Sequence, residues 1–165
     1  IKLFYNNKNK MFYFSGSNNE KLLTNKIEIF DNVIPSSNSV MFHNLLILGK
    51  IYNDKLYINL YNEMTKKLKK YLNNYEFMSN WIFINEINQK MINEIEIKDV
   101  SYNHKITKEI NSWYLPNKIL MYNNRPFSLH TKHENLKLSI YLCRNNVCNE
   151  TIHSINNLKN IITSN

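Results

Sequence analysis

Two carboxylates, Glu28 and Asp31, lie three residues apart just before a dense polar loop. A pair of carboxylates can supply the general acid and the general base for chemistry on a sugar. The same side chains also have a structural interpretation, in which Asp31 makes an Asx turn and Glu28 forms a surface salt bridge. We therefore name Glu28 and Asp31 as candidate catalytic residues and keep the structural alternative open.

The polar loop spans residues 31–39 and is rich in small hydrogen-bonding side chains. Ser36, Asn38 and Ser39 are candidates for binding the hydroxyl groups of a sugar or another polar ligand. Asn38 is the best placed chemically, because its amide can donate and accept at once. The same residues can equally satisfy the free N–H groups of a helix that begins near Val40.

The two cysteines, Cys143 and Cys148, form a Cys-x4-Cys pair. A redox pair normally has the spacing Cys-x-x-Cys, with the first thiol at a helix N-terminus. The cytoplasm disfavours a disulfide, so we expect structural or redox-responsive thiols. Zinc bound with His153, and with His130 or His133, matches no standard ligand spacing. We predict no metal and no other cofactor.

Three helices are expected to follow the polar loop and hold it in place. Residues 40–52 are apolar almost all round, which is typical of a helix buried on most faces. Apolar stripes at helical spacing predict two further helices, over 55–72 and 76–92. Short links between successive helices imply antiparallel hairpins.

After residue 93 the periodicity changes to that of a small α/β unit. Alternating apolar residues predict three short strands, and helical spacing predicts a helix over 104–114 and a final helix capped by Thr151. The strands are expected over 95–100, 119–122 and 138–142, with a polar loop over 123–135. We therefore predict a mainly α fold with a small α/β tail, divided into domains 1–94 and 95–165.

The composition bounds the protein class. The 165 residues are 43% hydrophobic and 13% aromatic, which is enough for a packed core and too much for a disordered chain. The sequence has no alanine and only 2 glycines, whereas Asn, Lys, Ile and Tyr are abundant. Codons rich in A and T encode the abundant residues, so this composition is expected from an AT-rich genome. The chain does not begin with methionine, so we expect a fragment of a longer protein.

The net charge of +8 is a weak signal for a nucleic-acid partner. An AT-rich genome raises the lysine content by itself, and four clustered lysines within 66–70 are typical of a solvated helix face. Arg144, between the cysteines, can bind an anion or pair with Glu150. No apolar run reaches the roughly 20 residues that span a membrane. We expect a cytoplasmic protein without a membrane or nucleic-acid partner.

Three motifs carry a family resemblance: residues 28–39 leading into Leu45–Gly49, then Tyr114–Lys118, then Tyr141–Cys148. Their order and spacing resemble the C-terminal part of the thioredoxin-domain-containing protein family, which includes a spermatogenesis-associated thioredoxin-like protein and bacterial relatives. The resemblance covers essentially the whole chain.

The resemblance implies a thioredoxin-like domain followed by a six-hairpin α/α toroid similar to those of glycoside hydrolases and sugar 2-epimerases. This chain would hold the last toroid helices and a βαβ–βα subdomain. Its partners would be the N-terminal thioredoxin-like domain, the rest of the toroid and a small polar or sugar ligand. The implied activity is carbohydrate-related, by analogy of fold alone. The alternatives are a non-enzymatic partner-binding or thiol-homeostasis module and a basic RNA-associated protein of ribosomal type.

Overall fold

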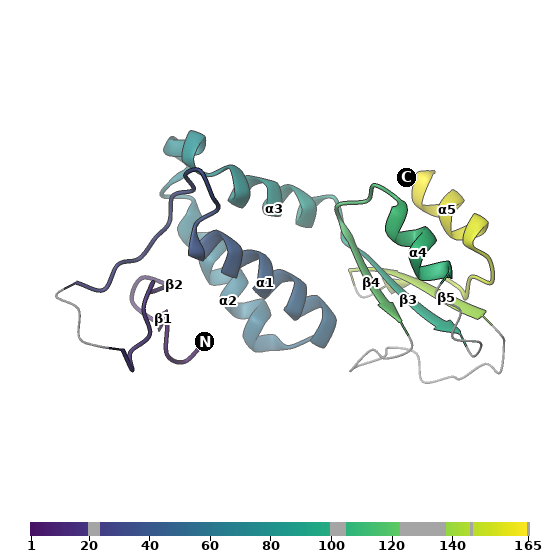
Figure 1. Ribbon diagram of the computed structural model, residues 1–165, viewed down its shortest axis with the longest axis horizontal. Coiled ribbons are helices and arrows are strands. Elements are labelled where there is room, and N and C mark those ends of the chain that lie inside the picture. The colour runs from purple at the N-terminus through teal and green to yellow at the C-terminus, as the bar shows by residue number, and fades with distance from the viewer. Residues whose placement is uncertain (20–23, 100–104, 123–137, 146, 165) are drawn as a thin grey trace. The chain divides into compact units, whose positions relative to one another are not determined.

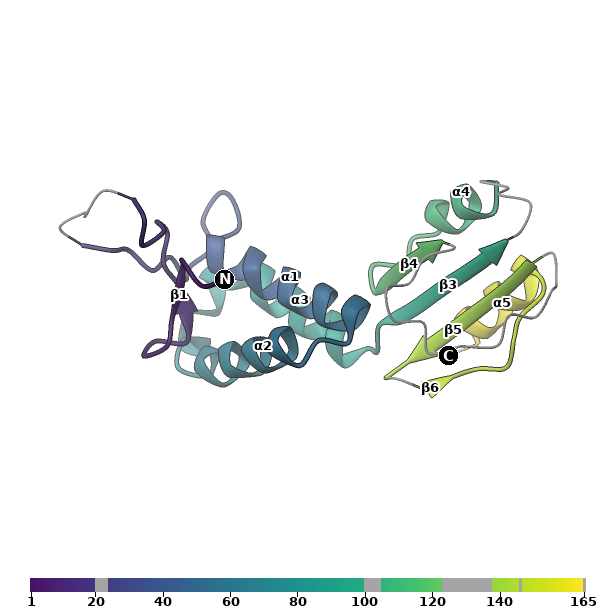
Figure 2. The same cartoon turned by 90° about the horizontal axis from the view of Figure 1, so that it is seen from below.

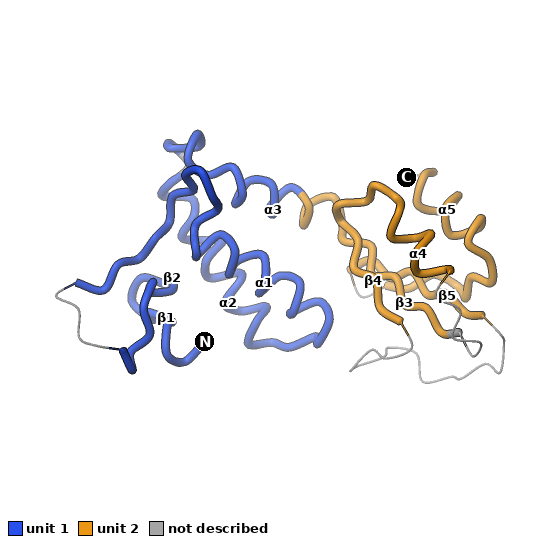
Figure 3. The backbone as a smooth tube through the Cα atoms, viewed as in Figure 1, with its two compact units in different colours: residues 1–86 blue, residues 87–165 orange. Residues whose placement is uncertain are grey.

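The computed structural model describes residues 1–19, 24–99, 105–122, 138–145 and 147–164. The chain divides into two compact units, Ile1–Glu86 and Ile87–Asn165 (Figure 3). The predicted boundary after residue 94 therefore falls later than the observed division, inside a strand of the second unit.

The first unit is built on α1 (Ser37–Tyr52), α2 (Lys55–Leu68) and α3 (Ser79–Gln89). These confirm the three predicted helices, although the third begins later than expected because a 3-10 segment, η1 (Leu72–Phe77), precedes it. The backbone leaves helical geometry at Asn74, with φ −110° and ψ 42°. Helices α1 and α2 lie side by side (Figure 1).

The link between α1 and α2 is only two residues long. Asn53 takes a left-handed backbone with φ 50°, which asparagine tolerates better than most residues, and ends α1. The Asp54 carboxylate then accepts from the Leu56 N–H at 2.7 Å and begins α2. Gly49 allows the two helices to approach closely, since a Cβ there would lie 3.1 Å from Ile58 Cγ1.

An aromatic cluster fills the core between the three helices. Phe42 stacks on Tyr61 with ring centroids 4.3 Å apart and meets Trp81 at 5.1 Å. Trp81 is only 1% exposed and so belongs to this core. The indole N–H donates to the Ile29 carbonyl at 2.8 Å, which satisfies its one polar group.

A two-stranded hairpin precedes these helices, formed by β1 (Tyr5–Asn6) and β2 (Met11–Phe12). The Tyr5 hydroxyl donates to Glu63 Oε2 of α2 at 2.7 Å, and Lys10 Nζ lies 3.0 Å from Glu63 Oε1. The Tyr5 hydrogen bond and Lys10 lower the pKa of Glu63, whereas burial and Glu63 raise the pKa of Tyr5. These contacts attach the hairpin to α2.

The second unit is a four-stranded mixed sheet with two helices. Strands β3 and β4 are parallel, β5 and β6 are antiparallel to their neighbours, and the order β4-β3-β5-β6 is clear in Figure 2. The elements in chain order are β3 (Asn93–Asp99), α4 (Lys105–Ser112), β4 (Lys118–Tyr122), β5 (Leu138–Arg144), β6 (Val147–Cys148) and α5 (Ile155–Thr163). Ser154, rather than the predicted Thr151, caps α5. The predicted loop over 123–135 lies outside the described residues.

The two faces of this sheet differ in character. Ile95, Ile97, Ile140 and Leu142 face α4 and α5 and build an apolar core with Ile110, Ile152 and Leu158. The alternate residues of β3 lie on the other face, where Glu94 pairs with Cys143 and Glu96 with Tyr141. Alternation along β3 therefore separates two apolar side chains from two carboxylates.

The prediction of a mainly α fold ending a six-hairpin toroid is wrong. Within its described residues the molecule is α/β, with five α-helices, a four-stranded sheet and a two-stranded sheet. The toroid was implied by the family resemblance and the hairpins by the short links between helices, but such hairpins occur in many folds, and after α3 the chain builds a sheet instead of another hairpin. None of the described helices combines the length and apolarity needed to cross a membrane.

Candidate functional site

Four side chains of the polar loop are buried in the first unit: Asp31, Ser36, Asn38 and Ser39. Asp31 is buried, and its Oδ1 accepts from the Ser36 N–H and the Ser39 hydroxyl, both at 2.8 Å. Its Oδ2 accepts from the Asn80 N–H at 2.9 Å, in the first turn of α3. One carboxylate therefore joins the N-terminal turns of α1 and α3, where a negative charge is favourable.

Asn38 is completely buried and binds main-chain groups on two sides. Its Oδ1 accepts from the Phe12 N–H at 2.7 Å, and its Nδ2 donates to the carbonyls of Phe12 and Glu28 at 2.9 and 2.8 Å. Ser36 donates to the Ile29 carbonyl and accepts from the Ser39 N–H, as an N-cap does. The contacts of these residues follow the structural alternative, in which the loop caps a helix.

Glu28 lies apart from this buried network. Its side chain is 28% exposed, with Oε1 3.3 Å from Lys26 Nζ and Oε2 accepting a long bond from the Ser37 N–H. The structure thus brings together Asp31, Ser36 and Ser39 and leaves Glu28 in a surface ion pair. The catalytic roles of Glu28 and Asp31 therefore stay predictions. Sequence reasoning missed Asn80, whose Nδ2 donates to Ser39 Oγ at 2.9 Å.

The sheet face away from α4 and α5 carries two buried glutamates of β3, Glu94 and Glu96, each 1% exposed. Neither carboxylate oxygen of Glu96 has a hydrogen-bond partner among the described residues. Among the described residues, Lys98 is the cation that pairs with it, with Nζ 3.8 Å from Oε1. A buried carboxylate without hydrogen bonds is costly, and one cation at this distance offsets only part of that cost.

We expect Glu96→Met to raise the free energy of unfolding by about 1–2 kcal/mol, because it removes a buried charge while keeping the side-chain length. Urea unfolding followed by circular dichroism measures the change. The matched control is Glu109→Met on the exposed surface of α4, which we expect to shift stability by at most about 0.5 kcal/mol. A loss of stability in Glu96→Met would show that the carboxylate makes a favourable interaction.

Cys143 and Cys148 form a disulfide, directly opposite each other on β5 and β6. The bond closes a six-residue hairpin that contains Arg144 and Val147. Cys143 is buried, whereas Cys148 is partly exposed. We expected structural or redox-responsive thiols because the cytoplasm disfavours a disulfide, whereas the structure joins the two sulfurs in a bond.

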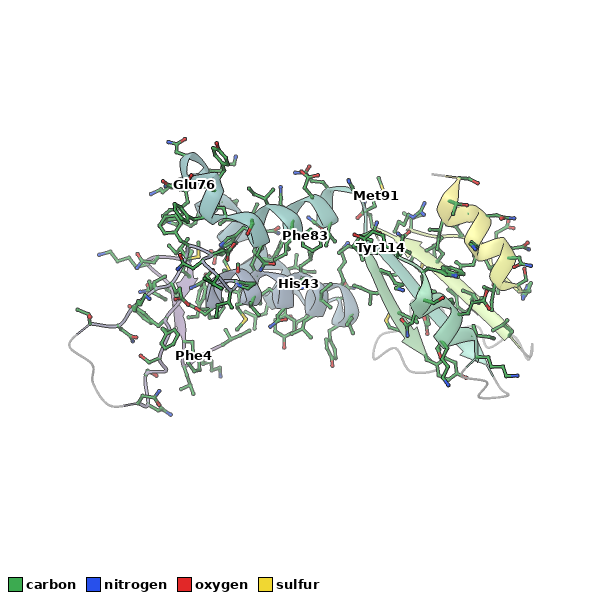
Figure 4. The ribbon with its side chains drawn as sticks, turned by 45° about the horizontal axis from the view of Figure 1, so that its top comes forward. Phe4, His43, Glu76, Phe83, Met91 and Tyr114 are labelled. Carbon is green, nitrogen blue, oxygen red and sulfur yellow. A yellow bond between two sulfur atoms is a disulfide. The ribbon has the colours of Figure 1, made fainter. Side chains whose placement is uncertain are left out.

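A cavity of about 600 Å³ opens at one end of the sheet in the second unit. Residues from five segments line it: the end of α3 with the link that follows it, the start of β3, the loop before β4, the end of β5 and the last turns of α5. They are Gln89, Lys90, Met91, Asn93, Leu115, Asn117, Arg144 and Ile162. Met91, labelled in Figure 4, lies in the link between α3 and β3.

Strand alternation explains why Asn93 and Arg144 face this cavity. Each lies two residues beyond a core residue of its strand, Ile95 or Leu142, and so projects from the face that the helices cover. Arg144 Nε donates to Asn93 Oδ1 at 2.7 Å. This bond orients the guanidinium group, whose other N–H groups make it a strong partner for an anion.

Two residues of the motif Tyr114–Lys118, Leu115 and Asn117, line the cavity. Asn117 Nδ2 donates to the Met91 carbonyl at 2.8 Å, and the Asn117 carbonyl accepts from the Asn93 N–H at 2.7 Å. Lys118 Nζ donates to the Ile110 carbonyl at 2.7 Å, at the C-terminal end of α4. Burial lowers the pKa of Lys118. The motif thus fixes the loop that lines the cavity.

The cavity is positively charged. Lys90 and Arg144 contribute two full charges, and its described lining contains no carboxylate. Helices α3 and α5 end at the cavity, and each C-terminus adds about half a negative charge. The two cations outweigh that contribution, so the site favours an anionic group beside the apolar surfaces of Met91, Leu115 and Ile162.

Sequence reasoning identified only part of this cavity. It named Arg144 as an anion-binding candidate with Glu150 as an alternative partner, and no ion pair between those two occurs in the described part of the chain. It missed Lys90, Asn93 and Asn117, because they are common polar residues in three separate segments. Groups of three or more His, Cys, Asp or Glu side chains suited to a metal are absent from the described residues.

Comparisons with protein-family models, with curated proteins and with solved structures found no match to this chain.

Proposed function

We propose that this chain is a non-enzymatic binding module that holds a small phosphorylated polar molecule, such as a sugar phosphate, in the cavity at Arg144. The observation that carries the proposal is the pairing of two cations, Lys90 and Arg144, in a cavity without a lining carboxylate. Arginine recognises phosphate oxygens through parallel N–H bonds. The amides of Gln89 and Asn117 suit the hydroxyl groups of the same ligand.

The lining residues favour binding over catalysis. The described lining offers no carboxylate, histidine, hydroxyl or thiol to act as an acid, base or nucleophile, beyond the amine of Lys90. A volume of about 600 Å³ lies within the range of small-molecule sites. The cavity therefore supports the partner-binding alternative and keeps a small polar ligand as the partner.

We expect glucose 6-phosphate to bind the full chain measurably, and Arg144→Gln to weaken that binding about 10- to 100-fold through loss of the charge-assisted bonds. Titration followed by NMR chemical shifts or calorimetry measures the affinity. Glucose and inorganic phosphate, tested separately, show which part of the ligand supplies it.

A second pair of variants separates the cavity from general surface charge. Lys90→Gln should weaken binding, whereas Lys108→Gln, an exposed lysine of α4 outside the cavity, should leave it unchanged. Equal losses in both variants, or no saturable binding of either phosphate probe by the wild-type chain, would refute the proposal.

We also propose a cytoplasmic location and, on the family resemblance alone, a thioredoxin-like domain as a partner. An upstream reading frame that encodes a Cys-x-x-Cys thioredoxin domain would support that resemblance, and its absence would remove the support. The carbohydrate activity by analogy with a toroid loses its structural basis, because the helices of this chain do not continue into further hairpins. The RNA-associated alternative would need binding that weakens steeply with salt.

A further inference from the structure

We infer that the Cys143–Cys148 disulfide controls the affinity of the cavity, so that oxidation favours ligand binding and reduction weakens it. The inference rests on the proposed function, because it concerns the same site. It follows from how the backbone of Arg144 is held in place.

Arg144 lies just beyond the part of the sheet that fixes β5. The ladder between β3 and β5 ends with the pair Glu94 and Cys143. The ladder partner of Arg144 is Val147 in β6. On the side of β3, Arg144 is held by the hydrogen bond from its own side chain to Asn93.

Strand β6 is a weak support without the disulfide. It contains only Val147 and Cys148, and it lies at the edge of the sheet. The chain after β6 stays bonded to β5 through the Asn149 N–H, which donates to the Leu142 carbonyl at 2.9 Å, and through the bridge between Ile140 and Ile152. These bonds lie along β5 away from Arg144, so the ladder of β6 beside Arg144 has only two residue pairs. The covalent bond between Cys143 and Cys148 therefore closes the hairpin that positions Arg144.

The disulfide does not line the cavity. Cys143 lies on the sheet face away from α4 and α5, opposite Glu94, whereas Arg144 projects from the helix-covered face. Reduction therefore leaves the chemistry of the lining unchanged and alters only the order of the backbone that carries Arg144. Its effect should differ from that of Arg144→Gln, which removes the charge itself.

The exposure of the two cysteines indicates which sulfur a reductant attacks first. A dithiol reductant reaches the partly exposed Cys148, and its thiolate forms a mixed disulfide with Cys148 Sγ while Cys143 leaves as a thiolate. The second thiol of the reductant then closes its own disulfide and releases Cys148. Two electrons and two protons pass from the reductant to the cysteine pair, which ends as two thiols.

The test measures glucose 6-phosphate affinity of the full chain in its oxidised state and after reduction with dithiothreitol. We expect reduction to weaken binding about tenfold, equivalent to about 1.4 kcal/mol, and reoxidation to restore it. The double variant C143S/C148S should bind with the affinity of the reduced chain and should not respond to dithiothreitol. Circular dichroism checks that the fold persists in each state.

The outcomes separate the two proposals. Equal affinity in both redox states, with Arg144→Gln still weakening binding, would overturn the redox inference and leave the cavity as the ligand site. Absence of binding in the oxidised wild-type chain would overturn the proposed function, and the inference with it. Loss of the sheet signal on reduction would also overturn the inference, because the effect would then be unfolding rather than release of one hairpin.

Discussion

Asp31→Ala should lower the free energy of unfolding of the first unit by about 3–4 kcal/mol, because it leaves one buried and one partly buried main-chain N–H group without an acceptor. These are the N–H groups of Ser36 and Asn80, at the starts of α1 and α3. The Ser39 hydroxyl loses the same acceptor. Urea unfolding of the full chain, followed by far-ultraviolet circular dichroism, measures the loss in the helical unit.

The matched control is Asp54→Ala, because Asp54 also caps a helix but makes one exposed hydrogen bond, to the Leu56 N–H. We expect a loss of about 1 kcal/mol there, the usual cost of an N-cap. Similar losses in both variants would show that Asp31 acts only as a local cap. Full stability in Asp31→Ala would contradict a structural role and return the carboxylate to the catalytic interpretation.

Trp81→Ala should cost about 3–5 kcal/mol, because it empties the centre of the aromatic core of the first unit. The indole is 1% exposed, contacts the Phe42 ring and donates to the Ile29 carbonyl. Trp81→Phe keeps an aromatic ring and loses the hydrogen bond, so we expect it to cost about 1–2 kcal/mol. Thermal and urea unfolding provide the comparison.

Trp113→Ala tests whether this effect is specific to the first unit. Trp113 is only partly buried and packs at the edge of the apolar core of the second unit. We expect Trp113→Ala to cost roughly half as much stability as Trp81→Ala, because folding buries less apolar area at Trp113. An equal loss in both variants would indicate that Trp113 is as central to its core as Trp81 is to its own.

Local patterns predicted most of the secondary structure of this chain. The apolar spacing placed α1 and α2 within a few residues of their observed bounds, and the alternation around Ile95 and Ile97 predicted β3. A helix cap in the polar loop was one of the two interpretations that the sequence left open, because a cap depends on residues close in sequence, and Ser36 is the N-cap of α1. The missed elements, β1, β2 and β6, are two-residue strands that leave no periodic pattern.

The architecture could not be predicted in the same way. Strand β3 pairs with β5, whose residues lie 39 to 49 positions later in the chain, and that pairing makes the second unit a mixed sheet. The family resemblance favoured a toroid, whereas β3 and β5 pair although a long stretch of sequence separates them. A hydrophobic repeat shows which face of an element is buried but not which element covers it.

The candidate sites show the same division between local and distant information. The sequence was sufficient to locate the polar loop of residues 31–39, to propose that it caps a helix and to single out Arg144, since each depends on residue types within one segment. Whether Asp31 and Asn38 face a ligand or the interior depended on groups of β2 and α3. The cavity at Arg144 joins residues from five segments, and only the folded chain brings Lys90, Asn93 and Arg144 around one space. Side-chain chemistry can be read along the chain, but a binding site depends on contacts between distant residues, which packing of the whole unit creates.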